Sequence, residues 1–287
     1  MAADLPPDPR LEPGTIPTYD PDAIISTLTE FYESLSKLPY IESSDILYPP
    51  PGGWPNITES NFAPLKKTPE VIDILKRLPY LRNPTRWGKG YLVSHDTFVI
   101  DYSNPPFGKN SEGKMVDGLD EDAVETWSPD YYFREDEKLP EWVVPLTRSE
   151  DNVSGVWLLL DTTDGTITTW DNEPVDDYPS TDPRKWRNNC QKTYPTLKEV
   201  LDEWRTEFLS LYAFAFWDKD ETARIWYDHE NVHGFWGRKE KEEVKEIQRI
   251  MLEHGWPNEF RREECKAALA QWVEDKLDPE AWEAQYG

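Results

Sequence analysis

Residues 156–170 read VWLLLDTTDGTITTW and carry the clearest strand–turn–strand pattern of the chain. Residues 156–160 form a short apolar run, which is typical of a buried strand. Residues 161–165 have the composition of a tight turn, because Asp tolerates left-handed backbone angles and Gly adopts them without steric cost. Residues 166–170 are rich in β-branched side chains, which favour a return strand. We therefore expect a β-hairpin within an antiparallel sheet.

Helices and strands are also indicated before this hairpin. Apolar side chains at helical spacing predict an amphipathic helix over residues 21–38, which the following proline ends. Thr68 is placed to cap a second helix, with Pro69 at its first position. Residues 91–102 and 142–146 are predicted to be strands, the latter leading into the hairpin.

The strongest helix signal follows the hairpin. Thr196 and Glu199 have the spacing of a capping box, in which each side chain satisfies a backbone N–H at the helix start. The apolar face behind them runs through Trp204 to Ala215. We expect this helix to pack across the sheet that contains the hairpin, and residues 222–227 to form a further strand.

Taken together, the pattern predicts an α+β fold: an antiparallel sheet with packed helices, plus a helical C-terminal extension. Residues 1–20 are acidic and proline-rich, and we expect a flexible tail there. The α+β domain is expected to span 21–230, with an acidic insertion near 112–141, and the extension to span 231–287. Within the extension, helical spacing of apolar residues recurs over 238–254 and 259–277.

The charge of the chain restricts its partners. Lys plus Arg is 31 and Asp plus Glu is 56, giving a net charge of −25 at pH 7. A charge of this sign repels phosphate backbones, and no local basic stripe offsets it, so nucleic-acid binding is not expected. The same charge favours a basic protein partner. The oligomeric state is left open by the sequence.

The sequence also indicates a compartment. Two cysteines, Cys190 and Cys265, are too few for a disulfide framework and favour a reducing environment. The first residues lack the basic and apolar regions of a signal peptide, and no run of about 18 apolar residues predicts a membrane span. We expect a cytoplasmic protein, with the nucleus as the other option, and no association with membranes.

One stretch matches a metalloprotease motif. His229-Glu230-Asn231-Val232-His233 fits H-E-x-x-H, in which two histidines on one helical face bind zinc and the glutamate activates water. Glu253 follows at a spacing suited to a third ligand. Against this, Gly234 and the strand-like flanks favour a turn. We therefore expect no metal and no other cofactor, and keep a zinc-dependent hydrolase with Glu230 as catalytic residue as an alternative.

Aromatic side chains in loops are the other candidates for function. Most of the 14 tryptophans are expected in the core, but a group in polar or proline-rich segments is typical of a binding surface. The candidates for binding are Trp54, Trp87, Tyr131, Tyr132, Trp142 and Trp186. An aromatic pocket built from them would favour an enzyme or accessory factor of secondary metabolism.

Several phrases resemble an uncharacterised family of cytosolic proteins from filamentous fungi. They are Leu38-Pro39-Tyr40, residues 49–55, 71–80 and 157–165, His254-Gly255-Trp256-Pro257, and residues 261–265. The order of elements is also similar to the SUKH superfamily, the fold of yeast cell-wall regulators and bacterial toxin-immunity proteins. The resemblance is carried by Trp157–Gly165, a strand that ends in Asp-x-x-x-Gly, followed by the helix after Thr196. It implies binding to other proteins, so our leading hypothesis is a non-enzymatic, acidic interaction protein.

Overall fold

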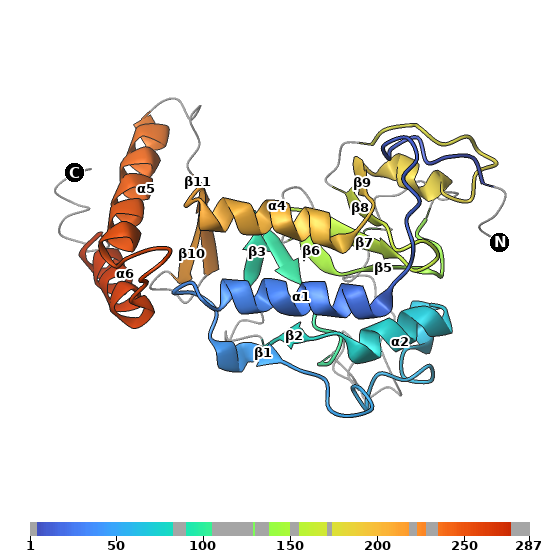
Figure 1. Ribbon diagram of the computed structural model, residues 1–287, viewed down its shortest axis with the longest axis horizontal. Helices are drawn as coiled ribbons and strands as arrows, with labels where there is room; N and C mark the ends of the chain where they lie inside the picture. Colours follow the sequence, from blue (N-terminus) through green and yellow to red (C-terminus); the bar gives the residue numbers. More distant parts are fainter. Residues whose placement is uncertain are drawn as a thin grey trace, which may run out of the picture.

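The computed structural model describes residues 5–82, 90–104, 129, 138–149, 155–170, 174–217, 223–227 and 235–276 (Figure 1). Its α-helices are α1 (Pro21–Leu35), α2 (Pro69–Arg77), α4 (Leu197–Leu209), α5 (Phe235–Glu253) and α6 (Arg262–Lys276). Its first strands are β1 (Ile46–Leu47), β2 (Tyr80–Leu81), β3 (Leu92–Ser94), β4 (Thr97–Val99), β5 (Val143–Pro145) and β6 (Thr147–Ser149). The later strands are β7 (Trp157–Asp161), β8 (Ile167–Trp170), β9 (Lys192–Tyr194), β10 (Ala213–Trp217) and β11 (Ala223–Tyr227). The fold is α+β with small antiparallel sheets, as predicted.

The predicted hairpin is confirmed by β7 and β8, which pair antiparallel with Trp157 opposite Trp170. The Gly165 N–H closes the turn by donating to the Asp161 carbonyl at 2.8 Å. Gly165 has φ +79°, and an added Cβ would lie 2.6 Å from the Thr18 carbonyl oxygen, so the position requires glycine. β5 and β9 flank the hairpin in a sheet of order β5-β7-β8-β9.

A second sheet, of order β3-β4-β6, continues the first one. β5 and β6 are consecutive in the chain, with Leu146 between them. The Leu146 N–H donates to the Leu158 carbonyl in β7, and the Leu146 carbonyl accepts from the Ile100 N–H just beyond β4. One stretch of chain therefore belongs to both sheets, and the two form a bent antiparallel meander. The strands predicted at 91–102 and 142–146 are confirmed in this meander.

Helices α1 and α4 lie side by side along this meander (Figure 1). Trp204 of α4 is 8% exposed, and its ring centroid lies 6.3 Å from that of Phe31 of α1. In the hairpin sheet α4 contacts β9, as the prediction of packing on this sheet requires, while its main neighbour is α1. The buried stripes of the two helices face each other, so this pair forms a large part of the core.

The predicted end of the long helix was wrong. α4 ends at Leu209, and residues 213–215, which the predicted helix includes, lie in β10. Leu211, with φ +59°, turns the chain out of the helix. β10 then pairs along its whole length with β11, and this pairing outweighs the helical spacing that residues 197–215 show in the sequence.

The start of α4 gives a prediction about its cap. Thr196 Oγ1 accepts from the Glu199 N–H at 3.4 Å, as the capping box predicts. Thr196→Ala removes this acceptor from an exposed helix start, so we expect a loss of about 1 kcal/mol in the free energy of unfolding. Urea denaturation of the variant beside Thr196→Ser, which retains a hydroxyl, measures this effect. Equal losses in the two variants would contradict it.

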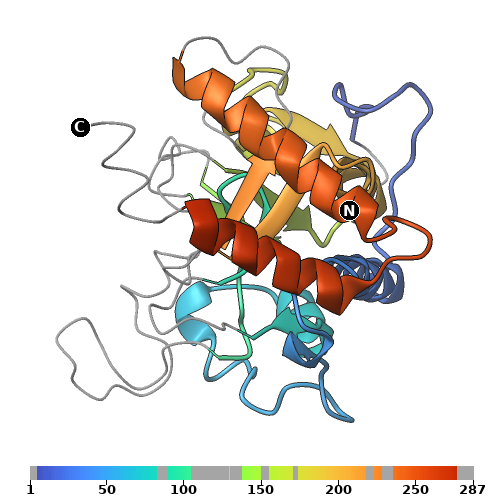
Figure 2. The same ribbon diagram turned by 90° about the vertical axis from the view of Figure 1, so that its left-hand side faces the viewer.

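The C-terminal helices are attached to the rest of the fold through their apolar faces. Figure 2 shows α5 and α6 beside each other in front of β10 and β11. Ile247 and Met251 of α5 and Leu269 of α6 are buried, and with β10 they border the same small gap. Arg262 of α6 donates to the carbonyls of Leu38 and Ile41 at 2.8 and 3.0 Å. Among the helices that the structure describes, none has the length and apolar character needed to cross a membrane.

The N-terminal segment differs from the flexible tail predicted for residues 1–20. Residues 5–20 run along the hairpin side of the molecule and lead into α1 (Figure 1). The Asp8 carboxylate accepts from Arg187 at 2.6 Å, and the Arg10 guanidinium donates to Asp177 at 2.7 Å. The composition of this segment is that of a disordered tail, but two charged side chains anchor it to partners far along the chain.

Candidate functional site

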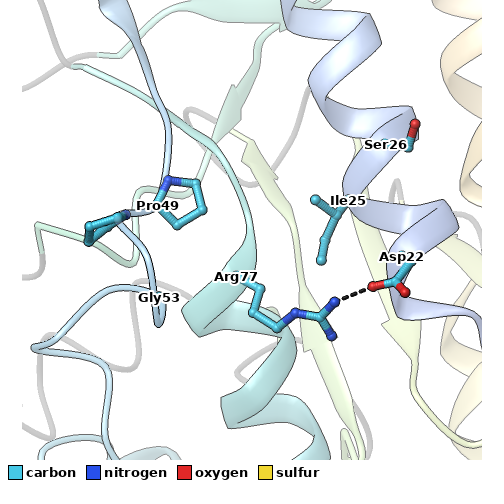
Figure 3. A pocket seen from close by; sticks show the side chains of 7 residues that line it. Asp22, Ile25, Ser26, Pro49, Gly53 and Arg77 are labelled. Atoms are coloured by element: carbon cyan, nitrogen blue, oxygen red, sulfur yellow. Dashed lines mark hydrogen bonds and ion pairs between the residues drawn. The ribbon is translucent and has the colours of Figure 1, made fainter.

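An open groove lies between α1 and the loop that follows β1. Its volume is about 360 Å³. Its walls are formed by Asp22, Ile25, Ser26, Pro49, Pro50, Gly53 and Arg77 (Figure 3). Figure 3 shows the prolines facing α1 across the opening, with Arg77 reaching from α2 toward Asp22. Since the groove is open and shallow, it suits a protruding side chain or an extended segment better than an enclosed small molecule.

Local sequence explains why the groove keeps its shape. The proline- and glycine-rich loop over residues 48–55 cannot form a helix or strand, so its position depends on contacts with α2. The Trp54 N–H donates to the Lys76 carbonyl at 2.9 Å, and its indole N–H donates to the Leu78 carbonyl at 2.8 Å. Gly53 has φ +82°, and a Cβ there would lie 2.6 Å from the Lys76 carbonyl oxygen. The loop is therefore fixed on the C-terminal end of α2.

Opposite charges meet at one end of the groove. Arg77 forms an ion pair with Asp22 through Asp22 Oδ1, and a longer one with Asp73 at 3.4 Å. Burial alone would lower the pKa of Arg77, but the hydrogen bonds to these two carboxylates raise it overall. The Asp22 side chain is 81% exposed, so its carboxylate stays accessible to a partner in solution.

The electric field beside the groove is dominated by acids. Tyr19 lies next to α2, and its pKa is raised to about 12, first by burial and then by Asp73 and Glu70, against the opposing effect of Arg77. Along α1, the exposed acids Glu30 and Glu33 continue the same charge. A cation approaching this face is therefore attracted, and an anion is repelled.

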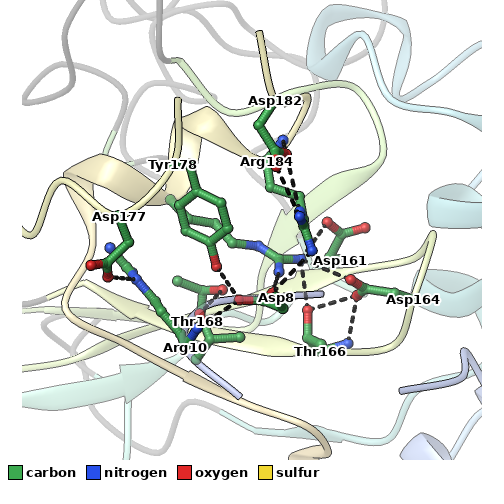
Figure 4. A network of polar contacts seen from close by, with 12 residues as sticks. Asp8, Arg10, Asp161, Asp164, Thr166, Thr168, Asp177, Tyr178, Asp182 and Arg184 are labelled. Atoms are coloured by element: carbon green, nitrogen blue, oxygen red, sulfur yellow. Dashed lines mark hydrogen bonds and ion pairs between the residues drawn. The ribbon is translucent and has the colours of Figure 1, made fainter. Parts of the chain in front are cut away.

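A buried polar cluster lies at the turn of the β7–β8 hairpin (Figure 4). Arg187, in a short 3-10 helix over Lys185–Asn189, is fully buried. Its Nη2 donates to Asp161 at 2.9 Å, to Asp164 at 3.0 Å and to Thr166 Oγ1 at 2.8 Å. Its Nη1 donates to Asp8 at 2.6 Å. The cluster thus joins both sides of the hairpin turn to the N-terminal segment.

The ionisation of this cluster follows from its burial. Burial and the neighbouring Asp164 raise the pKa of Asp161, while Arg187 opposes the shift. Burial would lower the pKa of Arg187, but Asp164 and Asp161 raise it, so the guanidinium stays charged. The carboxylates are occupied by Arg187 and by hydroxyl and backbone donors of the turn. The polar atoms of the cluster are therefore largely satisfied by one another.

Three of the six aromatic candidates lie among the described residues. Trp54 packs on Tyr80, with ring centroids 5.8 Å apart, and supports the groove loop from behind. Trp186 is 2% exposed and lies beneath the Arg187 guanidinium. Trp142 is partly buried and packs against the core beside β5. Trp87, Tyr131 and Tyr132 lie outside the described residues.

Of the residues proposed for the H-E-x-x-H zinc site, only Glu253 lies among the described residues. His229, Glu230 and His233 lie outside the described residues, between β11 and α5. A zinc-peptidase helix through both histidines would extend over 226–236, but residues 226 and 227 belong to β11. Glu253 is exposed, and both of its carboxylate oxygens accept from Arg249 Nη1, at 2.9 and 2.8 Å. Among the described residues, no group of three or more His, Cys, Asp or Glu side chains could hold a metal ion.

Zinc dependence is a direct test of this motif. Ligands that meet only in the folded state couple metal binding to stability, so a zincin would melt at a lower temperature with chelator. We expect the same melting temperature with zinc and with chelator, and no stoichiometric zinc in the purified protein. One equivalent of zinc, lost together with several degrees of melting temperature in His233→Ala, would establish the hydrolase instead.

The residues that form the groove and the cluster were not among the sequence candidates. Asp22 and Arg77 are charged residues of two ordinary amphipathic helices, and their pairing appears only in three dimensions. Arg187 lies in a polar stretch that resembles any surface loop. A signal was present in the hairpin turn, where two aspartates flank two threonines. Such a turn gathers negative charge that needs a cation when it is buried.

Comparisons with models of protein families, with curated proteins and with solved structures found no match to this chain. The resemblances to a fungal family and to the SUKH superfamily are therefore predictions from the sequence alone.

Proposed function

We propose that the protein is a non-enzymatic interaction protein that binds a basic partner protein, and that the groove beside α1 is its contact surface. The observation that carries this proposal is the acid-dominated field around the groove, in a chain of net charge −25. Opposite charge on a partner speeds association and disfavours acidic competitors. A basic protein as the partner also agrees with the sequence-based expectation that this acidic chain repels nucleic acids.

The chemistry of the groove wall supports a specific kind of contact. Pro49, Pro50 and Ile25 offer apolar surface beside the exposed Asp22 carboxylate. An arginine or lysine side chain has both matching parts, because its aliphatic stem packs on apolar atoms while its charged end stays at a carboxylate. Arg77 keeps Asp73 as a partner when an incoming cation competes for Asp22.

The order of elements supports the same class of function. The β7–β8 hairpin is followed by β9 and α4, similar to the closing unit of the SUKH superfamily, whose members bind other proteins. The chain departs from that order after α4, where the β10–β11 hairpin and helices α5 and α6 follow. These additions pack beyond the C-terminal end of α1, where β10, α5 and α6 meet Leu38 and Pro39.

Two matched charge variants test the proposal. Ser26, in the groove, and Gln271, on α6, are both exposed helical residues that donate to an acid four positions later. Binding of lysine- and arginine-rich peptides, and of glutamate-rich peptides of equal length, is measured at low and high salt. We expect only the basic peptides to bind, with roughly tenfold weaker binding to Ser26→Arg and little change for Gln271→Arg, because like charges across an interface are costly.

Each unfavourable result has a separate meaning. If basic peptides do not bind to the wild-type protein, the proposed function is wrong. If they bind and the two variants weaken binding equally, the protein attracts cations through its overall charge and the groove is not the contact surface. Turnover of a small metabolite by the purified protein would favour an enzyme.

A further inference from the structure

The N-terminal segment is held by two inserted side chains. The side chains of Asp8 and Arg10 are 6% and 5% exposed, whereas Leu5 and Ile16 are 40% and 88% exposed. Apolar packing therefore contributes little to the attachment of residues 5–16, and charged groups carry most of it. A segment attached in this way is bound like a ligand, through a few polar anchors on an otherwise exposed chain.

The groups around Asp8 form a site for one carboxylate. Asp8 Oδ2 accepts from Arg187 Nη1 at 2.6 Å and lies 3.7 Å from Arg184 Nη1. Asp8 Oδ1 accepts from the Tyr178 hydroxyl at 2.5 Å. Arg184 also donates to the Pro6 carbonyl at 3.0 Å, so both the side chain and the backbone of the segment are recognised.

Other contacts hold this site in place without the segment. Arg187 is fixed through Nη2 by the hairpin residues, which leaves Nη1 for Asp8. Arg184 donates to Asp182 through Nε at 3.0 Å and through Nη2 at 2.8 Å. The backbone N–H of Tyr178 donates to the buried Asn188 side chain at 3.0 Å. The donors are therefore preorganised, and preorganised groups lose little freedom when they bind a ligand.

An empty site would be costly. Arg187 Nε is already buried without a hydrogen-bond partner, and removal of Asp8 would leave Nη1 in the same condition. A buried donor without an acceptor destabilises the folded protein, because the group has given up its hydrogen bonds to water and gained none in return. The site thus has a strong requirement for an anionic acceptor of the size of a carboxylate.

We propose that Arg184, Arg187 and Tyr178 form a carboxylate-binding site, and that residues 5–10 are a tethered ligand whose Asp8 fills it. The occupant is the chain's own N-terminal segment, bound in cis and separable from the domain beneath it. This proposal is independent of the groove, and it implies that a carboxylate supplied from solution can replace Asp8.

Chemical rescue tests the site in the full chain. Asp8→Ala leaves room for a small carboxylate next to Arg187 and Tyr178, so the variant should melt at a lower temperature. Sodium acetate should raise this melting temperature by several degrees more than sodium chloride at the same concentration. Wild-type protein and Glu12→Ala, which removes an exposed acid of the same segment, should show no such difference between the salts. An equal response to both salts in Asp8→Ala would overturn the proposal.

A second measurement applies if Asp8→Ala does not fold. Asp8→Asn keeps the shape of the side chain but removes its charge, so the segment should detach more often. Arg10 is buried in the wild-type protein, and trypsin should cleave after it faster in Asp8→Asn than in Glu12→Gln. Equal cleavage rates would show that Asp8 does not hold the segment, and would overturn the proposal by a route that does not depend on rescue.

Discussion

Arg187→Leu should lower the free energy of unfolding by about 3–5 kcal/mol, the largest effect that we expect from a charged residue in this protein. The guanidinium is fully buried and is bonded to Asp8, Asp161 and Asp164. Its removal leaves Asp161 and Asp164 without this cation and leaves Asp8 only the longer contact with Arg184 at 3.7 Å. An uncompensated buried charge is far more costly than the loss of an exposed ion pair. Urea denaturation with a common slope for wild type and variant measures the difference.

Arg249→Leu is the matched control for this prediction. Arg249 is also an arginine paired with a carboxylate, Glu253, but its side chain is 58% exposed. Exposed pairs contribute about 0–1 kcal/mol because water already solvates both partners, so the control should lie near the wild type. Similar losses in the two variants would mean that burial does not strengthen the role of Arg187.

The parts of the fold that the sequence predicted depend on local signals. The β7–β8 hairpin has its apolar strand, turn and β-branched strand within one short stretch, so no distant information was needed. The caps at Thr68 and Thr196 were predicted for the same reason and are confirmed by hydrogen bonds to Val71 and Glu199. These features are decided by residues that are neighbours in the chain.

The parts that were missed depend on distant pairing. Residues 213–217 suit either a helix or a strand, and only pairing with β11 decides between them. Arg187 and Asp8 are separated by most of the chain, and nothing in either local sequence connects them. The same holds for Asp22 and Arg77, so the groove could not be placed from the sequence. The spacing of apolar residues predicts which face of a helix or strand is buried. The positions of charged residues follow no such pattern, so they do not predict ion-pair partners.

Trp204→Ala is the second large effect that we expect, with a loss of about 3–5 kcal/mol in the free energy of unfolding. Trp204 projects from α4 toward α1, where its ring meets Phe31, and it is 8% exposed. Truncation removes a large apolar side chain from the contact between the two helices, and the rigid helices around it can close the cavity only in part.

Leu209→Ala tests whether this loss comes from the burial of Trp204 or would follow the truncation of any apolar side chain in α4. Leu209 is an apolar residue at the end of α4, but it is 49% exposed, so its truncation should cost about 1 kcal/mol or less. Urea denaturation of both variants, with helix content followed by circular dichroism, separates loss of packing from loss of α4 itself. A small loss for Trp204→Ala would mean that the α1–α4 contact is not a main source of stability. In that case the groove beside α1 would rest on a helix held by weaker contacts, and its shape would have to be explained by the loop on α2 alone.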